Sequence, residues 1–160
     1  MKHGSFGGLP AGKDMGGSEV GHLTMGAGMI RVQGTTRINK AIADGSFFKS
    51  DALHDIIAHC QKGGCLHLTG LLSDGNIHSH IDHFIALIDH AYESGIKSLR
   101  LHALLDGRDV GIQSAQKYVA RIEEAFAYIN AQDGFSYGFA SGGGREQDRK
   151  STRLNSSHTV

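Results

Sequence analysis

The sequence of 160 residues contains no tryptophan, one proline and two cysteines. It has no run near the ~20 apolar residues that a membrane helix needs, and its first residues lack the apolar core of a signal peptide. Cys60 and Cys65 lack the second cysteine pair of a zinc site, and two thiols build no disulfide framework. We therefore expect free thiols in a cytoplasmic protein that has no membrane partner.

Net charge is also absent, because 16 Lys and Arg balance 16 Asp and Glu. Residues 148–160 show no apolar periodicity and look like a translated sequencing adapter joined to a truncated reading frame, so we expect a non-native tail there. They hold three of the 16 basic and one of the 16 acidic residues, which leaves a net charge of −2. This balance gives no reason to expect a nucleic-acid partner.

What the chain does contain is typical of one globular domain. Its hydrophobic content is 39%, its charged content is 20%, and glycine is abundant with 23 residues. Eleven histidines are also many. Most of them fall on predicted helices and strands and are interpreted as structural: His59, His67, His80, His83, His90 and His102.

Apolar periodicity predicts an alternation of helices and strands from residue 34 onward. A shorter apolar segment, Met25–Val32, is expected to be buried. Strands that alternate with helices are typical of a parallel sheet with right-handed crossovers, so residues 51–145 are expected to form a three-layer α/β unit. The predicted helices cover residues 34–45, 51–62, 81–94 and 115–130, and the predicted strands cover 65–72, 99–105 and 135–140.

Each predicted strand is followed by a glycine-containing loop with a group suited to binding an anion. His78 follows the first strand, Arg108 and Asp109 follow the second, and Arg145 follows the third. Ligands of parallel sheets bind outside the carboxyl ends of the strands, so these loops should converge. Guanidinium groups bind phosphate and carboxylate through paired N–H donors. Taken singly, each residue could be a solvated surface group, and Asp109 could simply pair with Arg108 and aim it.

A second candidate site lies in the glycine-rich stretch 14–22, where Ser18 stands between Gly17 and Glu19. If Ser18 opens a helix, its hydroxyl lies among unpaired N–H groups that favour a phosphate. The alternative is a plain turn with Ser18 as a helix N-cap. No general base stands at the spacing of a hydrolase triad, so a nucleophilic Ser18 would need a metal ion. No cluster of Asp and His ligands is evident, so either Ser18 is no nucleophile or the ligands lie outside this chain.

Several motifs, in this order along the chain, resemble the cofactor-independent (2,3-bisphosphoglycerate-independent) phosphoglycerate mutases. The resemblance runs from about Leu9 to Arg145, and the order of the motifs makes it specific. The motifs are residues 14–22, Gly26–Gly28, Thr36–Ile42, Asp44–Phe48, Gly70–Gly75, His78–His80 and Leu105–Asp109.

The resemblance implies an isomerase that interconverts 3-phosphoglycerate and 2-phosphoglycerate in glycolysis through a phosphoserine. It implies that Ser18 accepts the phosphoryl group and also contacts one of two Mn²⁺ ions. By position, it assigns substrate binding to His78, Arg108, Asp109 and Arg145.

The resemblance also implies a division of the chain. Residues 1–33 would be a fragment of the metal-binding domain of the alkaline phosphatase superfamily, and 34–147 would form an inserted phosphoglycerate-binding domain. The family's other metal ligands are absent from this chain, and Gly17 stands where the family commonly has Asn. We therefore expect a truncated chain, monomeric and inactive on its own.

Two alternatives stay open at this point. The first is a non-enzymatic α/β module that binds phosphorylated metabolites through Arg108 and Arg145 without a metal. The second is another metal-dependent member of the alkaline phosphatase superfamily, such as a phosphopentomutase or a phosphatase. The second alternative is less favoured, because such families are not expected to share the loops of His78 and of Arg108 and Asp109 in this order.

Overall fold

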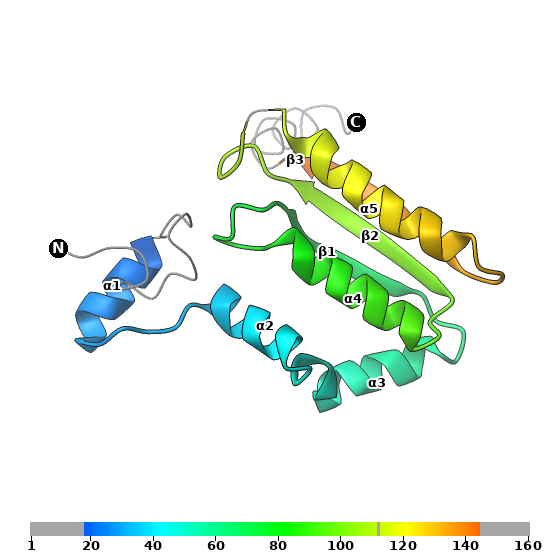
Figure 1. Ribbon diagram of the computed structural model, residues 1–160, viewed down its shortest axis with the longest axis horizontal. Helices are drawn as coiled ribbons and strands as arrows, with labels where there is room; N and C mark the ends of the chain where they lie inside the picture. Colours follow the sequence, from blue (N-terminus) through cyan, green and yellow to red (C-terminus); the bar gives the residue numbers. More distant parts are fainter. Residues whose placement is uncertain (1–17, 112, 145–160) are drawn as a thin grey trace, which may run out of the picture.

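The computed structural model describes residues 18–111 and 113–144 (Figure 1). Helices and strands alternate along most of this range, as the apolar periodicity predicts. The helices are α1 (Ser18–Ala27), α2 (Gly34–Ala43), the 3₁₀ helix η2 (Phe47–Lys49), α3 (Asp51–Cys60), α4 (Ile81–Glu93) and α5 (Ala115–Asn130). The strands are β1 (Leu66–Leu72), β2 (Ser98–Leu105) and β3 (Ser136–Gly144).

The three strands form one parallel sheet in the order β1-β2-β3. Helix α4 connects β1 to β2 and helix α5 connects β2 to β3, so the predicted parallel α/β unit is confirmed. Both helices lie on the same face of the sheet (Figure 1), as expected when successive crossovers have one hand and the strand order advances in one direction. A three-layer unit has helices on both faces of its sheet. Within residues 18–111 and 113–144, the structure shows two of these three layers, the sheet and one layer of helices.

The core lies between the sheet and helices α4 and α5. Successive residues of a strand point to opposite faces, and in β2 the buried Leu99, Leu101 and Ala103 alternate with more exposed residues. Helices α4 and α5 bury residues at the three- and four-residue spacing that one face of a helix requires. These buried residues are Ile81, Phe84, Ile88 and Ala91 in α4, and Tyr118, Ile122, Phe126 and Ile129 in α5.

The opposite face of the sheet carries a chain of polar contacts across all three strands. His67 Nδ1 of β1 lies 2.9 Å from His102 Nε2 of β2, and His102 Nδ1 lies 2.8 Å from Ser141 Oγ of β3. A bulge makes this possible: the register skips Ala140, so Ser141 stands opposite His102. The two histidines therefore have contacts on the sheet that periodicity alone did not reveal.

Three expectations about element boundaries and burial are wrong. Strand β3 continues to Gly144 rather than ending at Ala140, because after the bulge residues 141–144 pair with β2. The segment Met25–Val32 is not buried: α1 ends within it, Gly28 takes a φ of +61°, and Met25 remains 69% exposed because no other described element packs over it. Ile56, predicted on the inward stripe of α3, is exposed, while Ile57 and Cys60 are buried.

The two cysteines of the chain, Cys60 and Cys65, are free thiols, as predicted. In the part of the chain that the structure describes, no helix combines the length and the apolar character needed to cross a membrane.

Candidate phosphoglycerate site

Two loops meet at the carboxyl edge of the sheet, one after β1 and one after β2. The first carries His78 and the second carries Arg108 and Asp109. His78 Nε2 lies 4.0 Å from Asp109 Oδ2, and the side chain of His78 is 57% exposed whereas that of Asp109 is 11% exposed. Arg108, which precedes Asp109 in the sequence, is exposed. The structure thus brings His78 and Asp109 together, with an imidazole and a guanidinium accessible to an anion.

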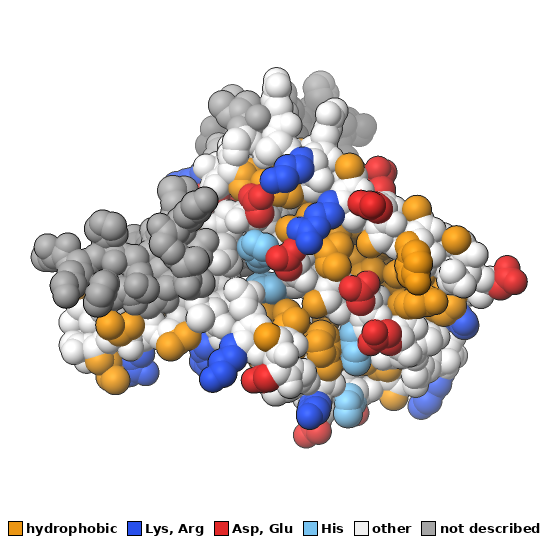
Figure 2. Space-filling view, in the orientation of Figure 1, with side chains coloured by type: hydrophobic (Ala, Val, Ile, Leu, Met, Phe, Trp, Pro, Cys, Tyr) orange, Lys and Arg blue, Asp and Glu red, His pale blue; other side chains and the backbone are white. Residues whose placement is uncertain are grey.

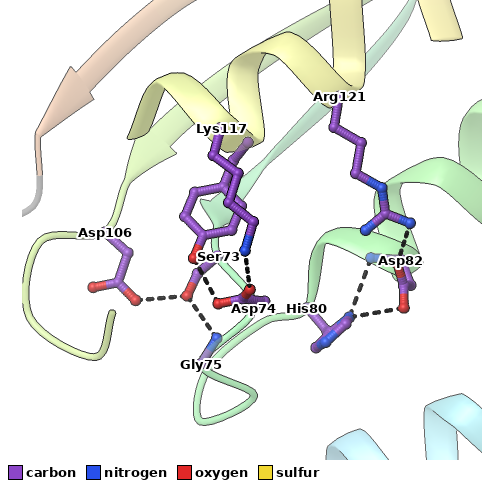
Figure 3. Close-up of polar contacts among 9 residues, drawn as sticks. Ser73, Asp74, Gly75, His80, Asp82, Asp106, Lys117 and Arg121 are labelled. Atoms are coloured by element: carbon purple, nitrogen blue, oxygen red, sulfur yellow. Dashed lines mark hydrogen bonds and ion pairs between the residues drawn. The ribbon is translucent and has the colours of Figure 1, made fainter. Parts of the chain in front are cut away.

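The two loops are joined underneath by buried polar side chains. Ser73 Oγ donates to Asp106 Oδ2 at 2.7 Å, and Gly75 N donates to Ser73 Oγ at 3.0 Å (Figure 3). Asp106 Oδ1 accepts from the backbone N–H groups of Arg108 at 3.0 Å and Asp109 at 3.1 Å. These contacts connect the foundations of both loops.

Helix α5 holds the first loop from the side. The Tyr118 hydroxyl donates to Asp74 Oδ1 at 2.6 Å, and Lys117 Nζ donates to Asp74 Oδ2 at 3.0 Å. Figure 3 shows Lys117 reaching from α5 toward Asp74. The hydrogen bond from Tyr118 lowers the pKa of the Asp74 carboxyl, with further lowering by Lys117. The carboxylate therefore remains charged and anchored at neutral pH.

The start of α4 forms the other side of the first loop. His80 is the N-cap of α4, and its Nδ1 accepts from the backbone N–H of Asp82 at 3.2 Å. Asp82 also pairs with Arg121 of α5 at 2.7 Å. His83 Nε2 lies 2.6 Å from Asn39 Oδ1 of α2, and burial lowers the pKa of His83. Figure 2 shows charged and histidine side chains gathered where α4 and α5 begin. His80 and His83 thus act in the packing of elements, as interpreted from the sequence.

A cavity of about 350 Å³ adjoins His78 on the side of the N-terminal helix. Val20 and Leu23 of α1 and the segment Arg31–Thr35 line it together with Ile77 and His78. Helix α1 therefore lies across a hollow from the loop that carries His78.

Two of the predicted site residues cannot be placed. Ser18 is the first residue of α1, which agrees with its predicted place at a helix start, but its side chain lies outside the described residues. Arg145 also lies outside the described residues, one position after the end of β3.

The described residues do not fit a metal centre. In the ranges 18–111 and 113–144, no three His, Cys, Asp or Glu side chains come together in a group that could hold a metal ion. The Mn²⁺ pair expected from the sequence thus has no ligand set among these residues.

Ser73 and Asp106 are site residues that the sequence analysis did not single out. Each directly follows a predicted strand and stands close before a glycine, in Ser73-Asp74-Gly75 and Asp106-Gly107. A small polar residue at that place can satisfy the backbone N–H groups of the turn that follows it. This signal was present in the sequence, but it could not reveal that the two side chains bond to each other.

Comparison with known proteins agrees with these observations. A model of the family described as BPG-independent PGAM N-terminus matches residues 38–153. The 2,3-bisphosphoglycerate-independent phosphoglycerate mutase of Staphylococcus saprophyticus is 51% identical over 120 residues, which cover 74% of this chain and 24% of that protein. The mutase of the same name from Staphylococcus haemolyticus is 47% identical over 139 residues, 86% of this chain and 26% of that protein.

A solved structure is similar as well. The phosphoglycerate mutase of Leishmania mexicana, crystallised at low cobalt concentration, superposes with a TM-score of 0.85 at 40% identity. The match covers 89% of this chain and 26% of the Leishmania chain. This chain thus spans about a quarter of the length of the relatives it matches. Since the family model covers most of the chain and the fold agrees, the chain belongs to the family of BPG-independent phosphoglycerate mutases.

Proposed function

We propose that this chain carries part of the substrate site of a phosphoglycerate mutase, which interconverts 3-phosphoglycerate and 2-phosphoglycerate. Membership of the family and the names of the relatives support the reaction. The observation that best supports the site is that His78 Nε2 lies 4.0 Å from Asp109 Oδ2, and that Arg108, next to Asp109 in the sequence, is exposed. The proposal further takes the protein to be a cytoplasmic monomer.

Each of the three residues has a chemical role that suits a phosphorylated hydroxy acid. The guanidinium of Arg108 offers paired N–H donors to a phosphate or carboxylate. His78 adds an N–H donor. The Asp109 carboxylate accepts a hydrogen bond from the free hydroxyl of the glycerate. In the proposal Arg145 contributes a second guanidinium.

The proposal assigns the phosphoryl-accepting role to Ser18, as the family resemblance implies. Two divalent metal ions, Mn²⁺ in our expectation, would lower the pKa of the serine hydroxyl and neutralise charge on the phosphoryl group. Because the described residues hold no group of metal ligands, these ions would take their other ligands from outside residues 18–144. The proposed division at residues 33 and 34 assigns Ser18 to the metal-binding unit and His78 to the substrate-binding unit.

The binding half of this proposal can be tested on the chain itself. We expect titration with 3-phosphoglycerate, followed by amide NMR shifts, to saturate at His78, Arg108 and Asp109. Arg108→Ala should weaken binding about tenfold or more, because a charge-assisted bidentate contact is lost. Arg37→Ala, at another exposed arginine on α2, is the matched control and should leave the affinity unchanged.

Further ligands test which groups of the substrate these loops bind. Glycerate without phosphate should bind more weakly than 3-phosphoglycerate, and Mn²⁺ should leave the affinity of these loops unchanged. Shifts spread evenly over the surface, or equal affinity in Arg108→Ala and the parent chain, would contradict the assignment. Mutase turnover by this chain with Mn²⁺ would show that residues 1–160 already contain the metal ligands.

A further inference from the structure

The carboxylate of Asp106 divides its two oxygens between the two loops of the site. Oδ1 accepts from the backbone N–H groups of Arg108 and Asp109, in its own loop. Oδ2 accepts from the hydroxyl of Ser73, in the loop that leads to His78. One side chain therefore bonds to both substrate-binding loops at once.

Burial makes these contacts strong determinants of the loop positions. Asp106 is 4% exposed and Ser73 is 1% exposed. A carboxylate withdrawn from water is tolerated only when donors surround it, and here two N–H groups and one hydroxyl do so. Moving either loop away would break a hydrogen bond to a buried charged oxygen.

Ser73 extends the connection into both ends of its own loop. Its hydroxyl accepts from the N–H of Gly75, and its carbonyl accepts from the N–H of Ile81, the first residue of α4, at 2.8 Å. The segment between these points contains His78. Both ends of the segment 75–81 are therefore hydrogen-bonded to Ser73. Through its bond to Asp106, Ser73 connects this closed loop to the turn that contains Arg108 and Asp109.

The loops are also in direct contact at Gly75. A Cβ at this position would lie 3.0 Å from the carbonyl oxygen of Asp109 and 3.1 Å from its Cβ. Such distances are shorter than ordinary van der Waals contact, so a side chain at position 75 would require the two backbones to move apart by a few tenths of an ångström. The separation of His78 and Asp109 therefore depends on packing as well as on hydrogen bonds.

We propose that Asp106, acting through Ser73, is a positioning residue that holds the His78 loop and the Arg108–Asp109 turn at their binding separation before substrate arrives. The inference rests on the proposed function, since it assigns a purpose to the geometry of that site. A site ordered in advance spends less binding free energy on ordering its loops, so affinity should fall when the connection is removed.

The test compares Asp106→Ala, Asp106→Asn and Ser73→Ala with the parent chain. Asp133→Asn, an exposed carboxyl between α5 and β3 at the opposite edge of the sheet, is the matched control. Two quantities are measured well below the unfolding temperature of every variant: amide hydrogen exchange in the two loops, and the dissociation constant for 3-phosphoglycerate. Because all variants are then fully folded, a role in stability alone leaves the affinity unchanged.

We expect Ser73→Ala to speed exchange at Gly75, whose N–H donates to the Ser73 hydroxyl, while the amides of Arg108 and Asp109 keep their protection. Asp106→Ala should speed exchange in both loops and weaken binding about tenfold. Asp106→Asn retains an acceptor and the side-chain shape, so it should recover much of the affinity. If Asp106→Ala does not fold, Ser73→Ala still severs the connection and is expected to weaken binding several-fold.

Failure of this inference differs from failure of the proposed function. Variants that bind 3-phosphoglycerate as tightly as the parent chain overturn the positioning role and leave the substrate assignment intact. A parent chain that does not bind 3-phosphoglycerate overturns the substrate assignment. In that case the amide-exchange measurement decides: unchanged protection of the Gly75 amide in the Asp106 and Ser73 variants overturns the coupling of the loops.

Discussion

Gly70 occupies the middle of β1, where a side chain would project into the helical layer. A Cβ built at this position would lie 2.7 Å from Cζ of Phe84, a buried ring on α4. The absence of a side chain lets the helix approach the sheet closely and lets the ring fill the space. Glycine is normally unfavourable in the middle of a strand. At position 70 it is required because the Phe84 ring occupies the space of a side chain.

We expect Gly70→Ala to lower the free energy of unfolding by about 1–2 kcal/mol, because the added methyl group overpacks a core that cannot move the Phe84 ring freely. Gly138→Ala in β3 is the matched control, since a Cβ there meets no atom within 4 Å. That control should be neutral or slightly stabilising, because alanine restricts the unfolded chain more than glycine does. Urea unfolding followed by circular dichroism measures both, and equal effects at the two positions would contradict the packing argument.

At the scale of elements, the end of α5 is fastened to the start of β3 by one side chain. Asn130 Nδ2 donates to the carbonyl of Tyr137 at 2.8 Å, and Asn130 Oδ1 accepts from the N–H of Tyr137 at 2.7 Å. Strand β3 is an edge strand of the described sheet, so its outward backbone groups need partners from elsewhere. Asn130 supplies both a donor and an acceptor, as a backbone neighbour would.

We expect Asn130→Ala to lower the free energy of unfolding by about 1–3 kcal/mol, because it leaves a partly buried N–H and C=O without their partner. Asn130→Asp keeps the acceptor for the Tyr137 N–H but places an oxygen against its carbonyl. It should therefore be no more stable than Asn130→Ala unless the carboxyl is protonated, so its free energy of unfolding relative to the parent should rise on acidification. Chemical denaturation of the variants and the parent at pH 7 and pH 4 measures both effects. An Asn130→Ala variant as stable as the parent would show that water fully replaces the hydrogen bonds of Asn130 to Tyr137.

At the scale of the whole molecule, the buried core is confined to the C-terminal two thirds of the described chain. Its buried members run from Ile57 to Tyr137, and the apolar side chains Leu23, Met25 and Met29 in and near α1 are exposed. Helix α2 contacts α4 through Asn39 and His83. The described residues 18–33 thus contribute little to the core that keeps the unit folded.

We expect a chain that begins at Gly34 to unfold cooperatively, with a free energy of unfolding within about 1 kcal/mol of the parent, because every buried core residue of the described ranges lies after Gly34. Urea titration of both chains under the same conditions measures this. The proposed domain boundary at residues 33 and 34 depends on the outcome. A loss of more than about 2 kcal/mol, or a broadened transition, would place residues 1–33 in the same folding unit.

The local sequence determined the elements that depend on neighbouring residues. The periodic apolar residues of α4 and α5 lie on one face of each helix, so the buried Ile81 and Ile122 were predictable from spacing. The turn residues after β1 and β2 indicated where His78, Arg108 and Asp109 would stand. The order of the motifs indicated the family, which the comparisons confirmed.

The tertiary structure alone decided which of these residues meet. Ser73 and Asp106 are 33 positions apart, and their hydrogen bond exists only because β1 and β2 pair in parallel with a particular register. The bulge at Ala140, which extends β3 and turns Ser141 toward His102, is likewise a product of pairing between strands. Periodicity reports on each segment's own apolar face, whereas register and contact depend on chain segments that are distant in sequence. The sequence therefore determined the helices, the strands and the positions of the loops, and the packing of the strands determined how the loops are held together.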